Sequence, residues 1–221
     1  MFGIPGGDGP EQGDWGRLAQ ALRVVPAYRQ ARRVFVGPAP VLAQIRINVL
    51  IDGKELLMPA PGLKDGFYLC RPYAIPFRDL AYATTYRGVP RFGQLLDNHA
   101  LAKTPVDLLV TDAVAVDSRG GRLGDGNGFF DLTCAIFAEL GVCESRGAEL
   151  WAVVADAQLV SESLPEDPWD IPLDGVLTPT GTRRFERPER ARATLFWQHL
   201  PRERIRRMTP LWKLYADLQA D

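Results

Sequence analysis

Arg119-Gly-Gly-Arg-Leu-Gly-Asp-Gly-Asn-Gly-Phe-Phe-Asp131 is the stretch that decides the fold, because it places five glycines in thirteen residues between two regular segments. Before it, residues 106–111 are short, apolar and branched, which is typical of a strand buried on both faces of a parallel sheet. After it, residues 130–140 carry apolar side chains at helical spacing and end at Gly141. A strand, a glycine loop and a helix in this order direct backbone N–H groups and the positive helix end at one point, which suits an anion such as phosphate.

The segments on both sides of this loop alternate between strand and helix patterns. Strands are expected at residues 33–36, 55–58, 66–70, 150–155, 158–160 and 174–178, and helices at 15–25, 41–51, 201–207 and 211–218. Prolines and scattered aromatic residues break every period between residues 71 and 102, where we expect loops with some helix. The strand, helix and strand over residues 33–58 predict a right-handed parallel crossover, and therefore an α/β fold.

Length and composition favour one folded unit. With 221 residues, 46% of them hydrophobic, the chain can bury one substantial core, so we expect a single domain over residues 15–221. Residues 1–14 are rich in Gly and Pro and contain no Lys or Arg, which predicts a mobile tail and neither a signal nor a transit peptide. The net charge of −1 gives no overall electrostatic case for nucleic acid or an anionic membrane.

Cysteine usage and hydropathy indicate a cytoplasmic protein. The three cysteines lack a CxxC spacing and are accompanied by only two histidines, so neither a disulfide framework nor a structural zinc site is supported. No apolar run is long enough to cross a bilayer. From residue 181 onward, ten Arg or Lys residues face five Asp or Glu residues, which fits either a solvated helix face or a contact with phosphate or a partner.

The glycine loop matches neither of the two common nucleotide-binding patterns. Its spacing is not G-x-G-x-x-G, and no lysine lies between residues 103 and 213 to complete a Walker loop. Glycines also serve hairpins and tight turns, so a purely structural role stays open. Arg122 offers a planar donor fork suited to phosphate. Asp131 is either a capping charge for the helix or, beside a phosphate, a ligand for a divalent cation such as Mg²⁺.

Three segments resemble the 5-formyltetrahydrofolate cyclo-ligase family, and more closely its cyclo-ligase-like branch. They are Val114-Ala-Val-Asp-Ser-Arg-Gly-Gly-Arg-Leu-Gly-Asp-Gly-Asn-Gly-Phe-Phe-Asp-Leu132, Gly53-Lys-Glu-Leu-Leu-Met-Pro59 and Trp169-Asp-Ile-Pro-Leu-Asp-Gly-Val-Leu-Thr-Pro179. The resemblance covers residues 28–180 in the expected order. It implies a three-layer αβα domain with a mainly parallel sheet, similar to sugar-phosphate isomerases and CoA transferases.

The resemblance also implies a reaction and a set of site residues. ATP with Mg²⁺ phosphorylates the formyl oxygen of 5-formyltetrahydrofolate, the ring amine attacks, and phosphate leaves. Nucleotide phosphates are expected at Arg122, Gly124, Asp125, Gly126, Asn127, Gly128 and Phe129, the substrate at Phe130, Trp169 and Asp170, and the metal at Asp131 and Asp117.

Several positions depart from the family pattern, and they concern the same chemistry. Asp125 and Asn127 stand where typical members carry basic residues, and Phe129 and Phe130 replace a tyrosine pair. The segment before Trp15 has no basic residue, where typical members have a helix whose Lys and Arg reach the phosphates. Position 169 is Trp instead of His, and residues 37–51 hold no carboxylate near the expected folate.

Two hypotheses from different functional classes follow. The first is an enzyme that uses ATP and Mg²⁺ to activate a formamide on folate or a smaller heterocycle, with altered or weakened activity and no catalytic residue assigned. The alternative is a non-catalytic paralogue that binds a nucleotide, phosphate or folate-like molecule. Nucleic acid and membrane partners are not expected, and a homodimer is an open option.

Overall fold

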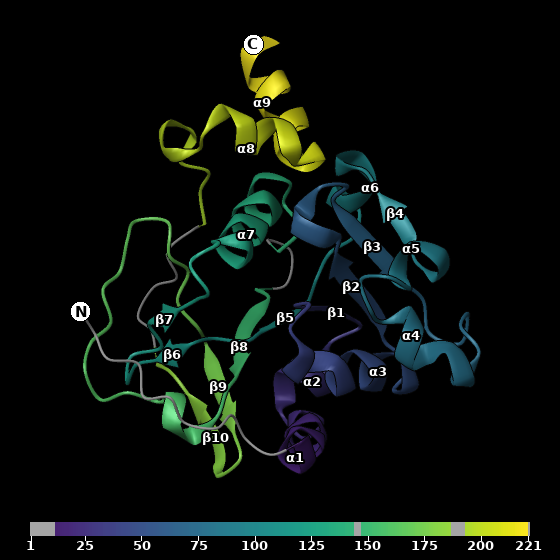
Figure 1. Cartoon of the computed structure of the whole chain (residues 1–221), viewed down its shortest axis with the longest axis vertical. Helices are drawn as coiled ribbons and strands as arrows, with labels where there is room; N and C mark the ends of the chain where they lie inside the picture. The colour runs from purple at the N-terminus through teal and green to yellow at the C-terminus, as the bar shows by residue number, and fades with distance from the viewer. Residues whose placement is uncertain (1–11, 144–146, 187–192, 221) are drawn as a thin grey trace.

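A large mixed sheet lies between two groups of helices in the computed structural model, which describes residues 12–143, 147–186 and 193–220 (Figure 1). In this part of the chain the sheet has eight strands in the order β10-β9-β8-β5-β1-β2-β3-β4. Their bounds are β1 Arg33–Val36, β2 Glu55–Pro59, β3 Phe67–Cys70, β4 Gln94–Leu96, β5 Leu108–Thr111, β8 Glu149–Val153, β9 Gly175–Thr178 and β10 Gly181–Arg184. A separate hairpin pairs β6, Ala115–Val116, with β7, Arg122–Leu123.

The central strands are parallel, as expected for an α/β fold. Strands β9, β8, β5, β1 and β2 run in one direction, and β1 connects to its neighbour β2 through α3, Ala43–Ile51, which confirms the predicted crossover. Strand β3 then pairs antiparallel to β2, and β10 antiparallel to β9. The sheet is therefore parallel in its middle and extended on both sides by antiparallel strands.

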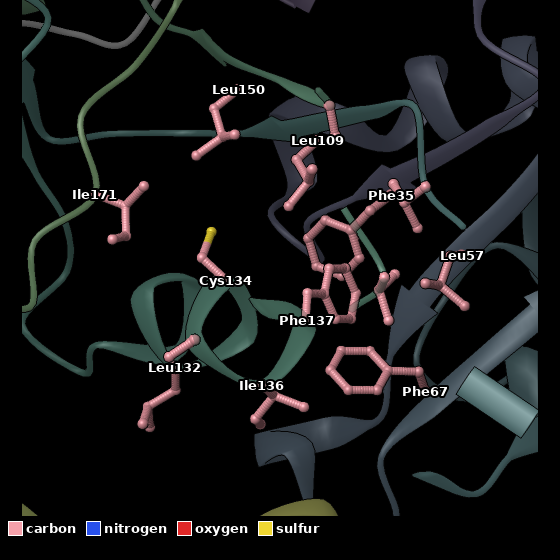
Figure 2. Packing of buried hydrophobic residues seen from close by; sticks show 14 of the residues in the cluster. Phe35, Leu57, Phe67, Leu109, Leu132, Cys134, Ile136, Phe137, Leu150 and Ile171 are labelled. Atoms are coloured by element: carbon pink, nitrogen blue, oxygen red, sulfur yellow. The ribbon is translucent and has the colours of Figure 1, made fainter. Parts of the chain in front are cut away.

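Side chains alternate between the two faces of the sheet because successive residues of a strand point in opposite directions. In β1, Phe35 belongs to the core that includes α7, Phe129–Glu139, whereas Val34 and Val36 belong to the core that includes α1, Gln12–Leu22, and α3. Figure 2 shows Phe35, Phe67 and Phe137 packed together beneath α7. The two cores confirm the expected three-layer arrangement.

The remaining helices are short except for α9, which has 12 residues. They are α2 Pro26–Gln30, α4 Leu80–Ala83, α5 Val89–Phe92, α6 Asn98–Ala102, α8 Arg202–Arg207 and α9 Thr209–Ala220, together with 3₁₀ turns at Pro40–Leu42, Pro61–Leu63, Phe77–Asp79, Asp156–Gln158 and Trp197–His199. The middle of the chain therefore contains short helices and strand β4, in line with the expectation of loops with some helix. Within the described residues no helix combines the length and the apolar character that a membrane span requires.

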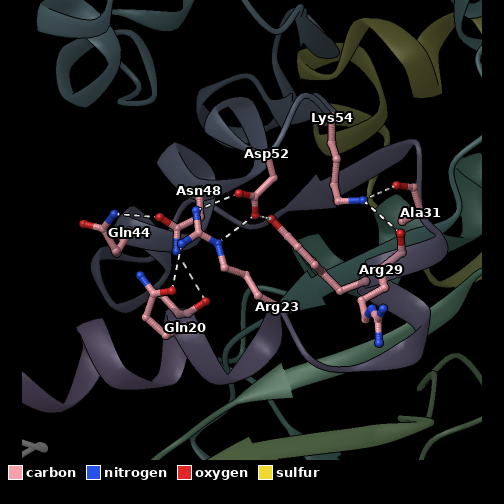
Figure 3. A network of polar contacts seen from close by, with 10 residues as sticks. Gln20, Arg23, Arg29, Ala31, Gln44, Asn48, Asp52 and Lys54 are labelled. Atoms are coloured by element: carbon pink, nitrogen blue, oxygen red, sulfur yellow. Dashed lines mark hydrogen bonds and ion pairs between the residues drawn. The ribbon is translucent and has the colours of Figure 1, made fainter.

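The first helix is fixed to α3 by a polar network (Figure 3). The guanidinium of Arg23 donates from Nε and Nη2 to the carboxylate of Asp52, each over 2.7 Å, and Tyr28 donates its hydroxyl to the same carboxylate over 2.8 Å. Asn48 donates to the carbonyl of Ala19 over 3.3 Å. Figure 1 shows α1 at the end of the molecule opposite α8 and α9, so Arg23 has a structural role there.

Two expectations at the level of single elements need comment. The prediction of a strand at residues 158–160 is wrong. A 3₁₀ turn ends at Gln158, and Leu159 makes only an isolated bridge to Val116. The side chain of Gln158 accepts from the Ala155 N–H over 2.7 Å and donates to the Ala113 carbonyl over 2.6 Å, which closes a turn in place of a ladder. The expected tail at residues 1–14 lies mostly outside the described residues, and α1 begins at Gln12.

Candidate functional site

The glycine loop begins with a turn that Asp117 organises. Its carboxylate accepts hydrogen bonds from the backbone N–H groups of Arg119 and Gly121, each over 2.8 Å, and of Leu164 over 3.0 Å. Although burial acts in the opposite direction, these bonds hold the pKa of Asp117 below its ordinary value. The side chain is 2% exposed and is not among the residues that line the cavity described below. Asp117 therefore stabilises the conformation of the loop without facing the cavity.

The turn before α7 is built from Asp125 to Gly128. Asn127 donates from its backbone N–H and its side-chain amide to Asp125, over 2.9 and 2.8 Å, and these bonds lower the pKa of Asp125. Gly128 then adopts φ 63°, a left-handed conformation that glycine tolerates best, and α7 starts at the next residue. The turn thus leads directly into the amino-terminal end of α7.

Arg122 and Asp131 form a buried ion pair at this helix end. Nη2 of Arg122 lies 2.6 Å from both carboxylate oxygens of Asp131, and the two side chains are 5% and 13% exposed. The guanidinium also lies 4.8 Å from the ring centroid of Phe130. Nε of Arg122 is buried and has no hydrogen-bond partner within the described chain.

A cavity of about 340 Å³ lies beside this pair, at the carboxyl ends of β1, β2 and β5. Arg122, Gly124, Asp125, Gly128, Phe129, Phe130 and Asp131 line it on the loop side. A side chain at Gly124 would place its Cβ 2.9 Å from Nη1 of Arg122, so the guanidinium would have to shift to admit it. The structure thus brings seven of the sequence-predicted residues together around this cavity. Gly126 and Asn127 do not line it and face a second cavity on the other side of the glycine loop.

The late segment containing Trp169 and Asp170 approaches the same helix end. The backbone N–H of Ile171 donates to Oδ1 of Asp131 over 3.2 Å. Burial, with a smaller contribution from Asp131, raises the pKa of the Asp170 carboxyl. Trp169 packs instead against Phe196, beyond the first cavity. Asp131 therefore has Asp170, and not Asp117, as its acidic neighbour.

Metal binding by protein ligands alone has little support. Over the residues that the structure describes, no group of three or more His, Cys, Asp or Glu side chains is placed to hold a metal ion. A Mg²⁺ ion usually needs only one or two carboxylates when substrate phosphates supply other ligands. Asp131 lines the cavity, whereas Asp170 is not among its lining residues and accepts a hydrogen bond from the Asp167 N–H over 2.8 Å.

Sequence reasoning missed three residues that shape the cavity. Asp112 follows β5 and lines the cavity, and its position just after a buried strand was an available signal. Buried Arg46 donates to the carbonyls of Gly37 and Ala39, over 2.7 and 3.0 Å, and so fixes the loop that forms one wall. Tyr86 also lines the cavity, and burial raises the pKa of its hydroxyl to about 12, so it is protonated at neutral pH.

Replacing Asp112 with asparagine is expected to stabilise the protein at neutral pH. Burial raises the pKa of Asp112 in the folded state, so its ionisation opposes folding once the pH rises above the unfolded value near 3.8. The variant removes that cost, and each kcal/mol removed raises the Tm by about 2–4 °C in a chain of this size. Thermal unfolding of both proteins at pH 7 and near pH 3.5 measures the difference. An advantage that is equally large at the acidic pH would contradict this explanation.

The fold and the site define a class: an α/β protein whose glycine loop, buried arginine and helix amino terminus meet at a cavity on the carboxyl edge of a parallel sheet. Comparison with known proteins specifies it further. The sequence profile of the 5-formyltetrahydrofolate cyclo-ligase family matches residues 12–179. The chain belongs to this family.

Individual relatives support the assignment. The chain is 32% identical over 206 residues to a methenyltetrahydrofolate synthase domain-containing protein from Bos taurus, an alignment that covers 90% of this chain and 52% of the relative. It is 41% identical over 75 residues to the 5-formyltetrahydrofolate cyclo-ligase of Escherichia coli K12, which covers 34% of this chain and 37% of that protein. The chain thus spans about half the length of the first relative.

A solved structure shows the same fold. The 5,10-methenyltetrahydrofolate synthetase of Aquifex aeolicus superposes with a TM-score of 0.52 at 21% identity, covering 85% of this chain and 88% of that one. At this identity the likeness establishes the fold.

Proposed function

We propose that this protein uses ATP and Mg²⁺ to activate a formamide on a folate or a smaller heterocycle, with altered or weakened activity relative to typical cyclo-ligases. The observation that carries the proposal is Arg122, which lines the 340 Å³ cavity together with the first residues of α7 and whose buried Nε has no hydrogen-bond partner within the described residues. A buried donor without a partner is costly, and a phosphate oxygen would satisfy it.

The residues at the loop fit a phosphate group. The first N–H groups of α7 have no partner within the helix, and the helix dipole adds partial positive charge at this end. Arg122 contributes a permanent charge, and Gly124 leaves room for close approach. These groups would hold and orient phosphates placed within the loop formed by residues 124–128.

The residues also fit a magnesium-bound phosphate. Asp131 and Asp170 are the two carboxylates that would hold the ion, with Asp131 kept in place by Arg122 and by the Ile171 N–H. Asp117 accepts hydrogen bonds from three backbone N–H groups and, unlike Asp131, does not line the cavity, which makes it the weaker candidate. The bound nucleotide would supply a transferable phosphoryl group to the amide oxygen.

The cavity would hold the amide-bearing substrate next to that phosphate. Phe35, Phe129 and Phe130 provide an apolar surface for a heterocycle, and Asp112 and Tyr86 provide polar groups at its rim. Their task is to orient the amide oxygen and to reduce its contact with water, which is the positioning and electrostatic contribution that such a reaction needs.

A non-catalytic ligand-binding paralogue is the alternative, and the charges in the cavity favour it. Asp112 and Asp125 both line the cavity, and no lysine is among its described lining residues. Carboxylates near a triphosphate weaken its binding, so this protein would hold a less charged ligand without turnover.

Purified protein incubated with 5-formyltetrahydrofolate and Mg-ATP is expected to form the methenyl product, detected by absorbance. Stabilisation by Mg-ATP in thermal unfolding measures binding independently of turnover. Ligand stabilisation without product supports the paralogue. The absence of both product formation and stabilisation by Mg-ATP would refute the proposed activity.

The double change Asp125→Lys and Asn127→Lys is expected to strengthen Mg-ATP binding about tenfold or more, because one unit charge at 4 Å contributes on the order of 1–4 kcal/mol in a wet site. Titration calorimetry measures the affinity. The control Asp217→Lys and Gln30→Lys adds the same charge at exposed positions on α9 and α2, away from the loop. Equal affinity in both variants would show that the phosphates bind elsewhere.

A further inference from the structure

A second cavity, of about 310 Å³, lies on the other side of the glycine loop. It shares Gly128 and Asp131 with the first cavity, so the two hollows meet at the amino-terminal end of α7. Trp169, Phe196 and His199 contribute to its wall, and Arg204 lies at the same hollow. The roles proposed above place phosphates and a metal ion at the loop side of this cavity, and no ligand against Trp169, Phe196 and His199.

Three aromatic rings form one wall of the second cavity. The ring centroid of Trp169 lies 6.0 Å from that of Phe196 and 5.0 Å from that of His199, and Phe196 and His199 are 6.4 Å apart. Trp169 and Phe196 are only partly buried, so part of their surface is accessible. A wall of this kind stacks against planar heteroaromatic groups.

A cation stands between this wall and the glycine loop. Arg204 donates a hydrogen bond to the carbonyl of Asn127, and its guanidinium lies 5.5 Å from the ring centroid of Phe129. Burial lowers the pKa of Arg204, yet the group is still protonated at neutral pH. The positive charge of Arg204 therefore lies beside the loop at Asn127. This is a position where typical members of the family resemble one another in carrying a basic residue and this sequence has Asn.

The segment that carries Phe196, His199 and Arg204 lies beyond the family match, which ends at residue 179. It is nevertheless docked, because Leu195, Ile205 and Met208 are buried in the same core as Leu132 of α7. Its position relative to the loop is thus fixed by packing, and it adds to the family fold a wall that the matched region alone does not provide.

We infer that the second cavity binds the planar base of the nucleotide. The C-terminal segment, residues 193–204, supplies Phe196 and His199 to the aromatic wall of this cavity, and Arg204 as a further cation close to the phosphates. The inference rests on the proposed function, because it needs nucleotide phosphates at the end of α7. The first cavity then receives the amide-bearing substrate. Gly128 and Asp131, which both cavities share, mark the place where the two ligands meet.

The test compares Mg-ATP with Mg-tripolyphosphate, which has the phosphates but no base, by titration calorimetry. The unmodified protein is expected to bind Mg-ATP about tenfold more tightly. Phe196→Leu is expected to remove most of this difference while leaving tripolyphosphate binding unchanged. Arg204→Ala is expected to weaken both ligands. Trp212→Leu, an exposed aromatic residue that is not among those lining the cavity, is the matched control and keeps the preference.

The outcomes separate the inference from the proposed function. Equal binding of both ligands to the unmodified protein, or an equal loss of both in Phe196→Leu, overturns the base site and leaves phosphate binding intact. Absence of binding for both ligands overturns the proposed function and the inference together. Should Phe196→Leu fail to fold, His199→Ala takes its place, because His199 is exposed and its removal is expected to reduce the preference severalfold.

Discussion

Replacing Arg122 with methionine is expected to lower the free energy of unfolding by about 3–5 kcal/mol. The change leaves Asp131, which is 13% exposed, without the cation that faces both of its carboxylate oxygens at 2.6 Å. An unpaired charge in a buried place costs far more than the pair itself contributes. Urea unfolding with linear extrapolation measures the loss.

A double variant distinguishes this explanation from a simple packing defect. Arg122→Met combined with Asp131→Leu removes both charges, so most of the lost stability is expected to return. Arg207→Met is the surface control: its side chain and that of Glu203 are 80% and 86% exposed, and the pair contributes at most about 1 kcal/mol. A double variant as unstable as Arg122→Met alone would contradict the ion-pair explanation.

Replacing Phe137 with alanine is expected to cost about 3–5 kcal/mol, the range for removing a buried phenylalanine. Phe137 is fully buried, and its ring centroid lies 5.6 Å from that of Phe35 and 5.0 Å from that of Phe67. The resulting cavity would lie between α7, which carries Phe137, and the strands that carry Phe35 and Phe67 (Figure 2).

The same denaturation experiment measures this effect. Phe77→Ala is the matched control, because Phe77 is 79% exposed and its removal should change stability by no more than about 0.5 kcal/mol. A loss below about 1 kcal/mol for Phe137→Ala would mean that the aromatic cluster relaxes to fill the space. A weaker affinity for Mg-ATP in this variant is also expected, since the helix end would lose its support.

Local patterns were sufficient for the central strands. The apolar run at residues 33–36 was expected to be a strand and is β1, because its side chains alternate between two buried faces. The same reasoning failed at residues 158–160, where the side chain of Gln158 closes a turn. The hairpin β6–β7 and the edge strands β4 and β10 were not anticipated, since strands of two to four residues carry little periodic signal.

The site was predictable only where its residues are neighbours in sequence. The glycine loop and Asp131 came from one continuous motif, and the structure places most of these residues around one cavity. Arg204 is 77 positions away from Asn127, and its contact with the loop depends on how α8 docks. Arg46 acts through burial, which a sequence pattern does not reveal, whereas the place of Asp112 after a buried strand was a signal that the sequence did offer.

The two ends of the eight-stranded sheet bear on self-association. Strand β10 exposes all four of its residues, and two of them are arginines, while β4 at the other end has only three residues. Short and positively charged edges are poor templates for adding a strand from a second molecule. Edge-to-edge aggregation is therefore disfavoured by these strands.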